Sequence, residues 1–328
     1  MIKYIGSLLL LFLIISCSKD QKNVDTSDLQ VQVDFRRLDL EIGASKSVED
    51  VNNVLTKNPG LVNSFIQFGI VPDQRFMANQ FYQLSLKGHG LFQKVNQELG
   101  DVDTIKSEIR DAFKHFKYYD SKFKEPILYW VISGFGGFSV DAKDSLTVII
   151  GSEYFLKQKD KYAPNRQELP YYLHQYFDRD HLVSKVTKRM VKGLYVEFDE
   201  ADATLVNQMI YWGKVFYMTE YILPTVQDSI IVEYSSEEME RVEANKKQTY
   251  NHFVANQLFF KEDHNSKLKY IDRRPHTNEL GDNAPGRIGQ YLGWEIVRSY
   301  MANNKVSLME LMKEKDHQKI FRKAKYKP

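Results

Sequence analysis

The residue with the clearest chemistry is Cys17, the only cysteine of the 328-residue chain. It closes the run Ile14-Ile15-Ser16-Cys17 behind a leader in which Lys3 supplies positive charge and residues 8–15 are apolar. A small residue before the cleavage point is typical of a secretory signal peptide. The pattern predicts that residues 1–16 are removed and that Cys17 becomes the lipidated, palmitate-bearing first residue of a bacterial lipoprotein.

The predicted anchor is lipid rather than protein. Residues 8–15 supply eight consecutive apolar residues, whereas a helix needs about 20 to cross the hydrocarbon core of a bilayer. Residues 17–30 are polar in composition, which is typical of a flexible tether. We therefore expect a folded body that is held at a membrane surface through the lipid on Cys17.

Histidines are the other candidates for site chemistry. Eight are scattered along the chain, and His174 and His181 flank an expected helix start. We weigh a metal pair there against ordinary structural roles. The loop at residues 276–283 begins with His276 and gathers polar residues before a helix N-terminus, where backbone amides favour anions. The same residue types also form turns and caps, so both readings of this loop stay open.

Other catalytic patterns are missing from the sequence. No Gly-x-Ser-x-Gly elbow of a serine hydrolase occurs, and the single cysteine is assigned to the anchor. The run Gly134-Phe135-Gly136-Gly137 lacks the spacing and the lysine of a phosphate-binding loop, so we interpret it as a glycine-rich strand end. Paired carboxylates of a glycosidase depend on spatial separation and are neither identified nor excluded. We predict no catalytic, cofactor-binding or metal-binding residue.

Charge is concentrated locally. The formal net charge is +2 and falls to +1 once the leader with Lys3 is removed, which argues against nucleic acid as a partner. Residues 228–243 hold six acidic residues, and residues 313–328 hold seven basic ones. We expect both segments to be solvated surface, and they are the candidate contact surfaces for a protein partner.

Hydrophobic periodicity predicts the elements of the first half. Alternation over residues 31–35, resumed over residues 38–42, predicts an early strand. Helical spacing over residues 47–119 predicts a lobe of three or four helices. Residues 127–135 and 146–155 are rich in β-branched and aromatic residues and predict two buried strands, which we expect to pair as a hairpin.

Three long helices are predicted to follow. The first spans about residues 179–198 with Asp178 or Asp180 as N-cap, the second spans about residues 203–223, and the third opens at Pro285. The polar face of the first helix carries His181, Lys185, Lys188 and Lys192.

Glycines inside the second and third helices indicate close packing. Gly213 in the second helix predicts a close crossing with another element, because a helix-interior glycine otherwise costs about 1 kcal/mol relative to alanine. Gly289 and Gly293 form a Gly-x-x-x-Gly pair, but charged neighbours exclude a membrane dimer. We expect close packing in a soluble core.

Together these patterns predict an α+β fold that is predominantly helical, in which a helical lobe precedes a strand pair and long helices. We expect a single two-lobed globular domain over residues 31–328. Its first lobe spans about residues 31–125 and its second about residues 126–312, and residues 313–328 form a basic tail.

Three passages carry a resemblance to a known family. They are Val33-Asp34-Phe35-Arg36-Arg37-Leu38-Asp39, Met209-Ile210-Tyr211-Trp212-Gly213-Lys214 and the run at residues 284–297. With them, nearly the whole chain resembles the GldB-type gliding-motility lipoproteins of gliding Bacteroidetes. The resemblance implies a role in moving cells over surfaces, alongside envelope motors, surface adhesins and their secretion machinery. It also implies an outer-membrane position that faces the periplasm.

The second half also resembles zinc proteases with a zincin-like arrangement, in which a strand pair precedes a metal-binding helix. Such enzymes need His-Glu-x-x-His, because two imidazoles four residues apart share one helical face. The motif is absent, and the comparable face carries Lys188 and Lys192, whose ammonium groups repel a cation. On the second helix Trp212 precedes Gly213, where an acidic ligand is expected. The resemblance therefore implies a degenerate scaffold, a pseudoenzyme without metal.

Two functions remain open from the sequence. The favoured hypothesis is a non-catalytic, lipid-anchored envelope component required for gliding, which holds other gliding-machinery proteins and takes no small-molecule substrate. The alternative is an envelope hydrolase, such as a peptidase, whose site the sequence does not reveal.

Overall fold

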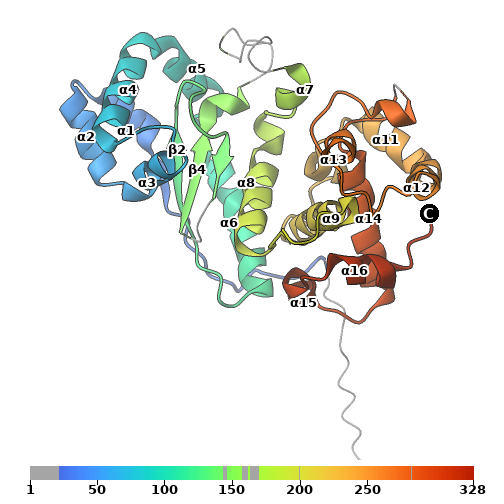
Figure 1. Cartoon of the computed structure of the whole chain (residues 1–328). Coiled ribbons are helices and arrows are strands. Elements are labelled where there is room, and N and C mark those ends of the chain that lie inside the picture. The colour runs from blue at the N-terminus through green and yellow to red at the C-terminus, as the bar shows by residue number, and fades with distance from the viewer. Residues whose placement is uncertain (1–21, 143–145, 157–161, 163–169, 199, 282) are drawn as a thin grey trace, which may run out of the picture.

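The computed structural model describes residues 22–142, 146–156, 162, 170–198, 200–281 and 283–328. Helices lie on both sides of a small central sheet, and a further group of helices packs beyond one side (Figure 1). The predicted class, α+β and predominantly helical, is confirmed. Cys17 and the predicted leader lie outside the described residues, so acylation at Cys17 stays a prediction. No helix in the described ranges combines the length and the apolar character that crossing a membrane demands.

The sheet has the strand order β1-β2-β4-β3. Its strands are β1 (Phe35–Arg37), β2 (Ile127–Val131), β3 (Val140–Asp141) and β4 (Thr147–Gly151). Both β1 and β4 run parallel to β2, and β3 runs antiparallel to β4. The predicted hairpin between the two buried strands is therefore wrong. The chain after β2 first forms β3 at the sheet edge, and β4 then inserts between β2 and β3.

The chain between β1 and β2 is helical, as predicted. Its helices are α1 (Leu38–Ala44), α2 (Val48–Thr56), α3 (Pro59–Gln67), α4 (Gln74–Lys87), α5 (His89–Leu99) and α6 (Val102–Tyr119). Residues 47–119 hold five helices, α2 to α6, rather than the three or four expected, because turns such as those at Asn58 and Gly88 separate short helices.

The strand that was expected to resume at Leu38 is wrong, because α1 begins there. Leu38 and Ile42 are buried, whereas Leu40 between them is 51% exposed. Residues four apart, such as Leu38 and Ile42, lie on the same face of a helix, here the buried face. Apolar residues at 38, 40 and 42 also fit strand alternation, which is why the sequence predicted a strand.

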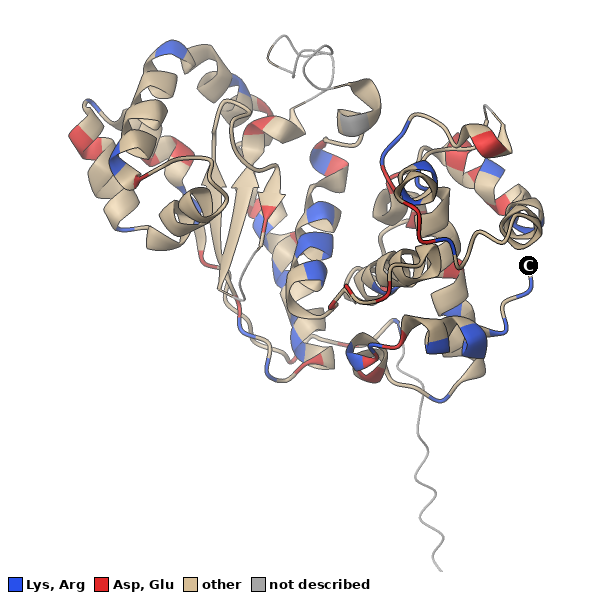
Figure 2. Cartoon of the chain, in the orientation of Figure 1, with Lys and Arg blue, Asp and Glu red and all other residues tan. Residues whose placement is uncertain are grey.

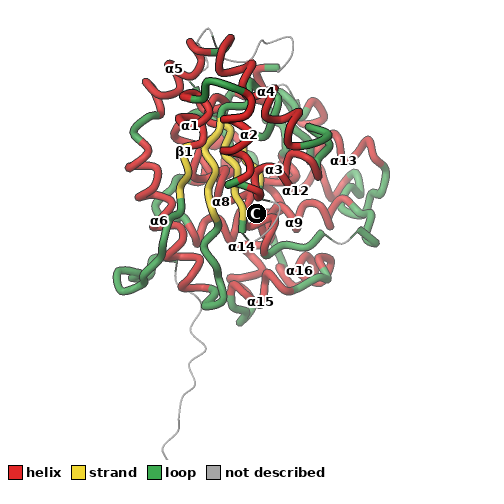
Figure 3. The backbone as a smooth tube through the Cα atoms, turned by 90° about the vertical axis from the view of Figure 1, so that its left-hand side faces the viewer, coloured by secondary structure: helices red, strands yellow, loops and turns green. Residues whose placement is uncertain are grey.

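Alternating side chains of the sheet enter two separate cores. Leu128 and Trp130 of β2 contribute to the larger core, and Tyr129 and Val131 contribute to the smaller one. The smaller core is completed by buried residues of α1 to α4, which cover that face of the sheet. Figure 3 looks onto the sheet from the side of these helices. The larger core lies on the opposite face and extends to the C-terminal helices.

The C-terminal half is built from helices. They are η1 (Ser152–Phe155), α7 (Tyr171–His174), α8 (Arg179–Leu194), α9 (Leu205–Ile222), α10 (Asp228–Val232), α11 (Ser236–Ala244), α12 (Lys246–Ala255), α13 (His264–Tyr270), η2 (Asn278–Leu280), α14 (Ile288–Asn303), α15 (Leu308–Lys313) and α16 (His317–Ala324). The three predicted long helices correspond to α8, α9 and α14. Asp178 caps α8 by accepting a hydrogen bond from the His181 amide. The start predicted at Pro285 is too early, because Arg287 takes a left-handed backbone conformation with φ 62° just before α14.

The close crossing predicted for Gly213 is confirmed. It lies where α9 crosses α14, and a Cβ added to Gly213 would lie 2.4 Å from the carbonyl oxygen of Gly293. A Cβ added to Gly293 would lie 1.9 Å from the carbonyl oxygen of Met209. The two helices therefore touch backbone to backbone, which no residue larger than glycine permits at these positions.

Residues 313–328, expected to be a basic tail, fold against the body of the protein. Ile320 and Ala324 of α16 are buried. From α9, the Lys214 ammonium donates hydrogen bonds to the backbone carbonyls of Met312 at 3.1 Å and Glu314 at 2.8 Å. The C-terminal helices are thus tied to α9 by buried apolar contacts and by a buried lysine.

Gly213→Ala is expected to lower the free energy of unfolding by about 3 kcal/mol, because the new methyl group overpacks a backbone contact. Gly136→Ala is the matched control, since a Cβ there meets nothing closer than 3.4 Å. Urea unfolding followed by circular dichroism measures both. Equal stability of the two variants would contradict the backbone contact between α9 and α14.

Candidate functional site

A charged cavity of about 400 Å³ lies beside α8, between α9 and the chain that leads into α14. Its cationic lining residues are Lys185, Lys188, Arg189, Lys192, Arg273 and Arg287. The cavity is also lined by two carboxylates, those of Glu233 and Asp272, and by the aromatic rings of Phe177, Trp212 and Phe216. The Lys and Arg residues of α8 follow one another along the helix (Figure 2).

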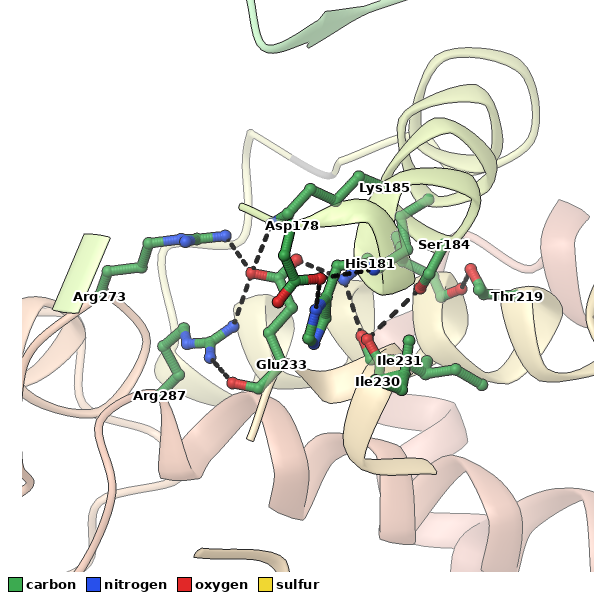
Figure 4. Close-up of polar contacts among 12 residues, drawn as sticks. Asp178, His181, Ser184, Lys185, Thr219, Ile230, Ile231, Glu233, Arg273 and Arg287 are labelled. Carbon is green, nitrogen blue, oxygen red and sulfur yellow. Dashed lines mark hydrogen bonds and ion pairs between the residues drawn. The ribbon is translucent and has the colours of Figure 1, made fainter. Parts of the chain in front are cut away.

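Glu233 is the centre of this cavity wall (Figure 4). Its carboxylate lies 2.9 Å from Nζ of Lys185 and 2.5 Å from Nζ of Lys188, and it forms a further ion pair with Arg273. Nη1 of Arg287 lies 3.9 Å from the same carboxylate. Glu233 is 3% exposed, so one buried acid holds four basic side chains together.

The electrostatics of the cluster follow from this imbalance. Burial by itself would raise the pKa of Glu233, but the cations of Lys185, Lys188, Arg273 and Arg287 hold it well below its ordinary value. Burial lowers the pKa of Lys185 to about 7 and that of Lys188 to about 8, and the single carboxylate only partly opposes this. Glu233 is therefore ionised, and its single negative charge does not neutralise both Lys185 and Lys188.

The backbone is strained on both sides of the ion cluster. Glu233 has φ 60° and Arg287 has φ 62°, which lie in the left-handed region that residues other than glycine rarely adopt. Nη2 of Arg287 donates a hydrogen bond of 2.6 Å to the Glu233 carbonyl, and Nζ of Lys188 donates one of 2.8 Å to the Ile231 carbonyl. Such strain costs about 1–3 kcal/mol per residue and persists only where surrounding contacts fix it.

Lys192 stands one turn beyond Lys188 at the edge of the cavity. Its ammonium lies 4.4 Å from the centre of the Trp212 ring, a cation–π contact. Burial, with help from the nearby Arg189 and Arg273, lowers the pKa of Lys192 to about 8. Within the described ranges, no carboxylate reaches ion-pair distance of its ammonium.

The three candidate histidines do not line this cavity. His181 is buried, and its Nδ1 lies 2.7 Å from the carboxylate of Asp178, the N-cap residue of α8. His174 is buried in α7, and His276 is exposed and bridges to Pro285 through the backbone. In the part of the chain that the structure describes, no three His, Cys, Asp or Glu side chains gather as a metal site would require.

The loop at residues 276–283 makes contacts of the kind expected for a turn. The Thr277 hydroxyl donates a 2.7 Å hydrogen bond to the carbonyl of Pro285, and the Thr277 amide donates to the carbonyl of Ala284. The N-cap position of α14 is Arg287 rather than a residue of the loop. A ligand at this loop stays a prediction.

The glycine-rich run after β2 is organised by a buried acid. One carboxylate oxygen of Glu153 accepts hydrogen bonds from the Ser133 amide, from the Ser133 hydroxyl and from the Phe135 amide. Gly134 and Phe135 both adopt positive φ at this turn. Because a carboxylate of the chain occupies these donors, the interpretation as a turning strand end rather than a phosphate-binding loop fits the geometry.

Sequence reasoning missed the central residue of the cavity. Glu233 belongs to the acidic segment at residues 228–243 that was expected to be solvated, and for Glu233 this is wrong because four cations pull it inside. Lys185 and Lys188, assigned to a polar helix face, are buried as well. The one usable signal was that these two lysines and Lys192 share a single face of the helix.

Comparison with known families decides the identity of the chain. The family model described as gliding motility protein GldB, a lipoprotein family, matches residues 19–328. The chain belongs to the GldB family. The resemblance stated from sequence is thus confirmed, and with it a role in gliding motility and an association with the cell envelope. No curated protein and no solved structure gave a match. The zincin-like likeness of this GldB family member remains a resemblance only.

Glu233→Gln is expected to lower the free energy of unfolding by about 3–5 kcal/mol, because three buried cations and the partly buried Arg273 lose their counter-charge. The matched control is Glu240→Gln, an exposed acid of α11, which should change stability little. Chemical unfolding at neutral pH measures both variants. A loss for Glu233→Gln no larger than for the control would show that the cations do not depend on this carboxylate.

The lowered pKa of Lys192 makes stability depend on pH. Between about pH 8 and the ordinary lysine value of 10.5, the folded chain has released a proton from Lys192 that the unfolded chain keeps. The free energy of unfolding therefore rises with pH across this interval. Lys192→Met lacks this contribution, so its gain between about pH 7.5 and pH 9.5 is expected to be smaller than that of the parent. Equal gains would contradict the shift.

Proposed function

We propose that this GldB family member is a lipid-anchored, non-catalytic component of the gliding apparatus that holds protein partners through its folded surface. Family membership supplies the role in gliding. Cys17 supplies the anchor, with the protein on the periplasmic side of the outer membrane. The proposal adds the partner-binding role and the lack of chemistry, and each has its own structural support.

The observation that carries the non-catalytic part is the positive charge of the cavity. Lys188 and Lys192 of α8 occupy the face where the resemblance to zincin-like proteases implies metal ligands, and the Lys192 ammonium lies 4.4 Å from the centre of the Trp212 ring. Protonated ammonium groups offer no lone pair and repel a metal cation. Glu233, the buried acid at this place, is already engaged by four cations.

Exposed apolar side chains support a partner-binding role. Ile66, Phe68, Phe76 and Leu86 are all at least 39% exposed and belong to α3, α4 and the turn between them. Phe76 also lines a second cavity, of about 530 Å³, between α4 and the glycine-rich turn after β2. A contiguous exposed apolar patch is typical of surfaces that contact other proteins, and we propose that these four residues belong to one such surface. The acidic segment at residues 228–243, apart from its buried Glu233, and the basic segment at residues 313–328 are further candidate contact surfaces.

The anchored motility role predicts that Cys17→Ala abolishes gliding while the folded body stays intact. A strain that lacks the protein is complemented with the parent chain, with Cys17→Ala or with Ser18→Ala, and single cells are tracked on glass. The parent and the Ser18→Ala control should restore movement, because both keep the lipid site. Movement of the strain without any complement would overturn the motility role.

The hydrolase alternative is tested in the same strain. Alanine replacement of His174, His181 and His276 removes the candidate histidines, and circular dichroism checks that the variant folds. A folded variant that restores gliding supports the non-catalytic proposal. A folded variant that fails to restore gliding favours the envelope hydrolase.

A further inference from the structure

The cavity beside α8 carries more positive charge than its own acids neutralise. Arg189 is set aside, because it pairs with Asp141 at 2.6 Å. The remaining charged lining consists of Lys185, Lys188, Lys192, Arg273 and Arg287 against Glu233 and Asp272. Among the lining residues that the structure describes, five basic side chains face two carboxylates, an excess of three positive charges when all five are protonated. Asp272 is exposed, so solvent weakens its share of the neutralisation.

This excess of positive charge is unfavourable because the cavity is lined by protein rather than by water. Like charges repel more strongly there than in water, because the effective dielectric constant is lower. Aromatic faces relieve part of the repulsion, since Lys185 lies 4.4 Å from the centre of the Phe177 ring and Lys192 lies 4.4 Å from that of Trp212. Burial first, and the neighbouring cations after it, lower the pKa values of Lys185 and Lys192. An anion bound between these groups would neutralise the excess positive charge.

We propose that this cavity is a binding site for a phosphate monoester, held by the lysines of α8 together with Arg273 and Arg287. A monoester dianion matches the excess charge better than a single carboxylate does. Its three terminal oxygens accept hydrogen bonds from several directions, as separate ammonium groups and planar guanidinium groups supply them. The site uses cavity groups alone, so it stands or falls independently of the partner-binding role.

The size and walls of the cavity fit a small ligand that extends beyond the phosphate. A volume of about 400 Å³ lies in the range of small-molecule sites. Trp212 and Phe216, whose ring centres lie 5.7 Å apart, form an apolar part of the cavity lining, and Phe177 lines it beside Lys185. The phosphate is therefore expected against the α8 lysines, and the esterified group is expected against the aromatic rings.

Isothermal titration calorimetry with glycerol 3-phosphate tests the site. All proteins are full chains with Cys17→Ala, so that acylation does not vary. The parent should bind saturably, and Lys192→Met should weaken binding about tenfold or more, equivalent to about 1.4 kcal/mol. Lys247→Met, which removes one exposed lysine of α12, is the matched control and should bind like the parent.

Two results would overturn the site. One is the absence of saturable binding by the parent at glycerol 3-phosphate concentrations up to about 10 mM. The other is equal weakening by Lys192→Met and Lys247→Met. If Lys192→Met does not fold, Arg273→Gln takes its place, because the Arg273 side chain is 33% exposed and its loss leaves Glu233 with two lysine partners.

The same titration distinguishes two sources of the phosphate monoester. Dihexanoyl phosphatidic acid carries the same ester as glycerol 3-phosphate, with short acyl chains added. Tighter binding of the lipid than of glycerol 3-phosphate, lost in Lys192→Met, supports the site and identifies a lipid headgroup as its ligand. Equal or weaker binding of the lipid, again with loss in Lys192→Met, supports the site and identifies a soluble phosphate ester.

Discussion

The ionised carboxylate of Glu233 is the constraint on which the arrangement of the C-terminal half depends. It lies just after α10, yet its partners come from α8 and from both ends of the chain that links α13 to α14. Three segments far apart in sequence are thereby fixed to one buried group. The backbone of Glu233 and of Arg287 accepts a left-handed conformation to complete these contacts. Side-chain electrostatics therefore override local backbone preference at this point.

This cluster can form only because α9 and α14 approach each other closely. Gly213 and Gly293 let the two helices touch, and α14 begins immediately after Arg287. A wider crossing would carry the start of α14, and Arg287 with it, away from α8 and Glu233. The helix crossing and the ion cluster therefore stabilise the same arrangement. The crossing does so through glycines that let the backbones touch, and the cluster does so through buried ion pairs.

Local patterns in the sequence predicted the three long helices well and predicted their assembly poorly. The cap at Asp178, the long helices and the crossing at Gly213 all follow from effects within a few residues. The parallel pairing of β2 with β4 did not follow, because strand direction depends on where β3 lies in the sheet. Glu233 was assigned to the surface for a similar reason: its partners lie 40 or more residues away in sequence, and an acid-rich segment looks solvated until those cations are placed.

The positive charge of this cavity argues against a metal centre more strongly than the loss of any single ligand does. A zinc site needs neutral imidazoles or anions that lend lone pairs to a cation. Here the comparable helix face presents ammonium groups, and the one buried acid is committed to them. Placing histidines at 188 and 192 would remove two cations but would leave Lys185, Arg273 and Arg287 facing the same space. Among the described residues, the positive charge is thus a property of the cavity lining as a whole rather than of two positions of α8.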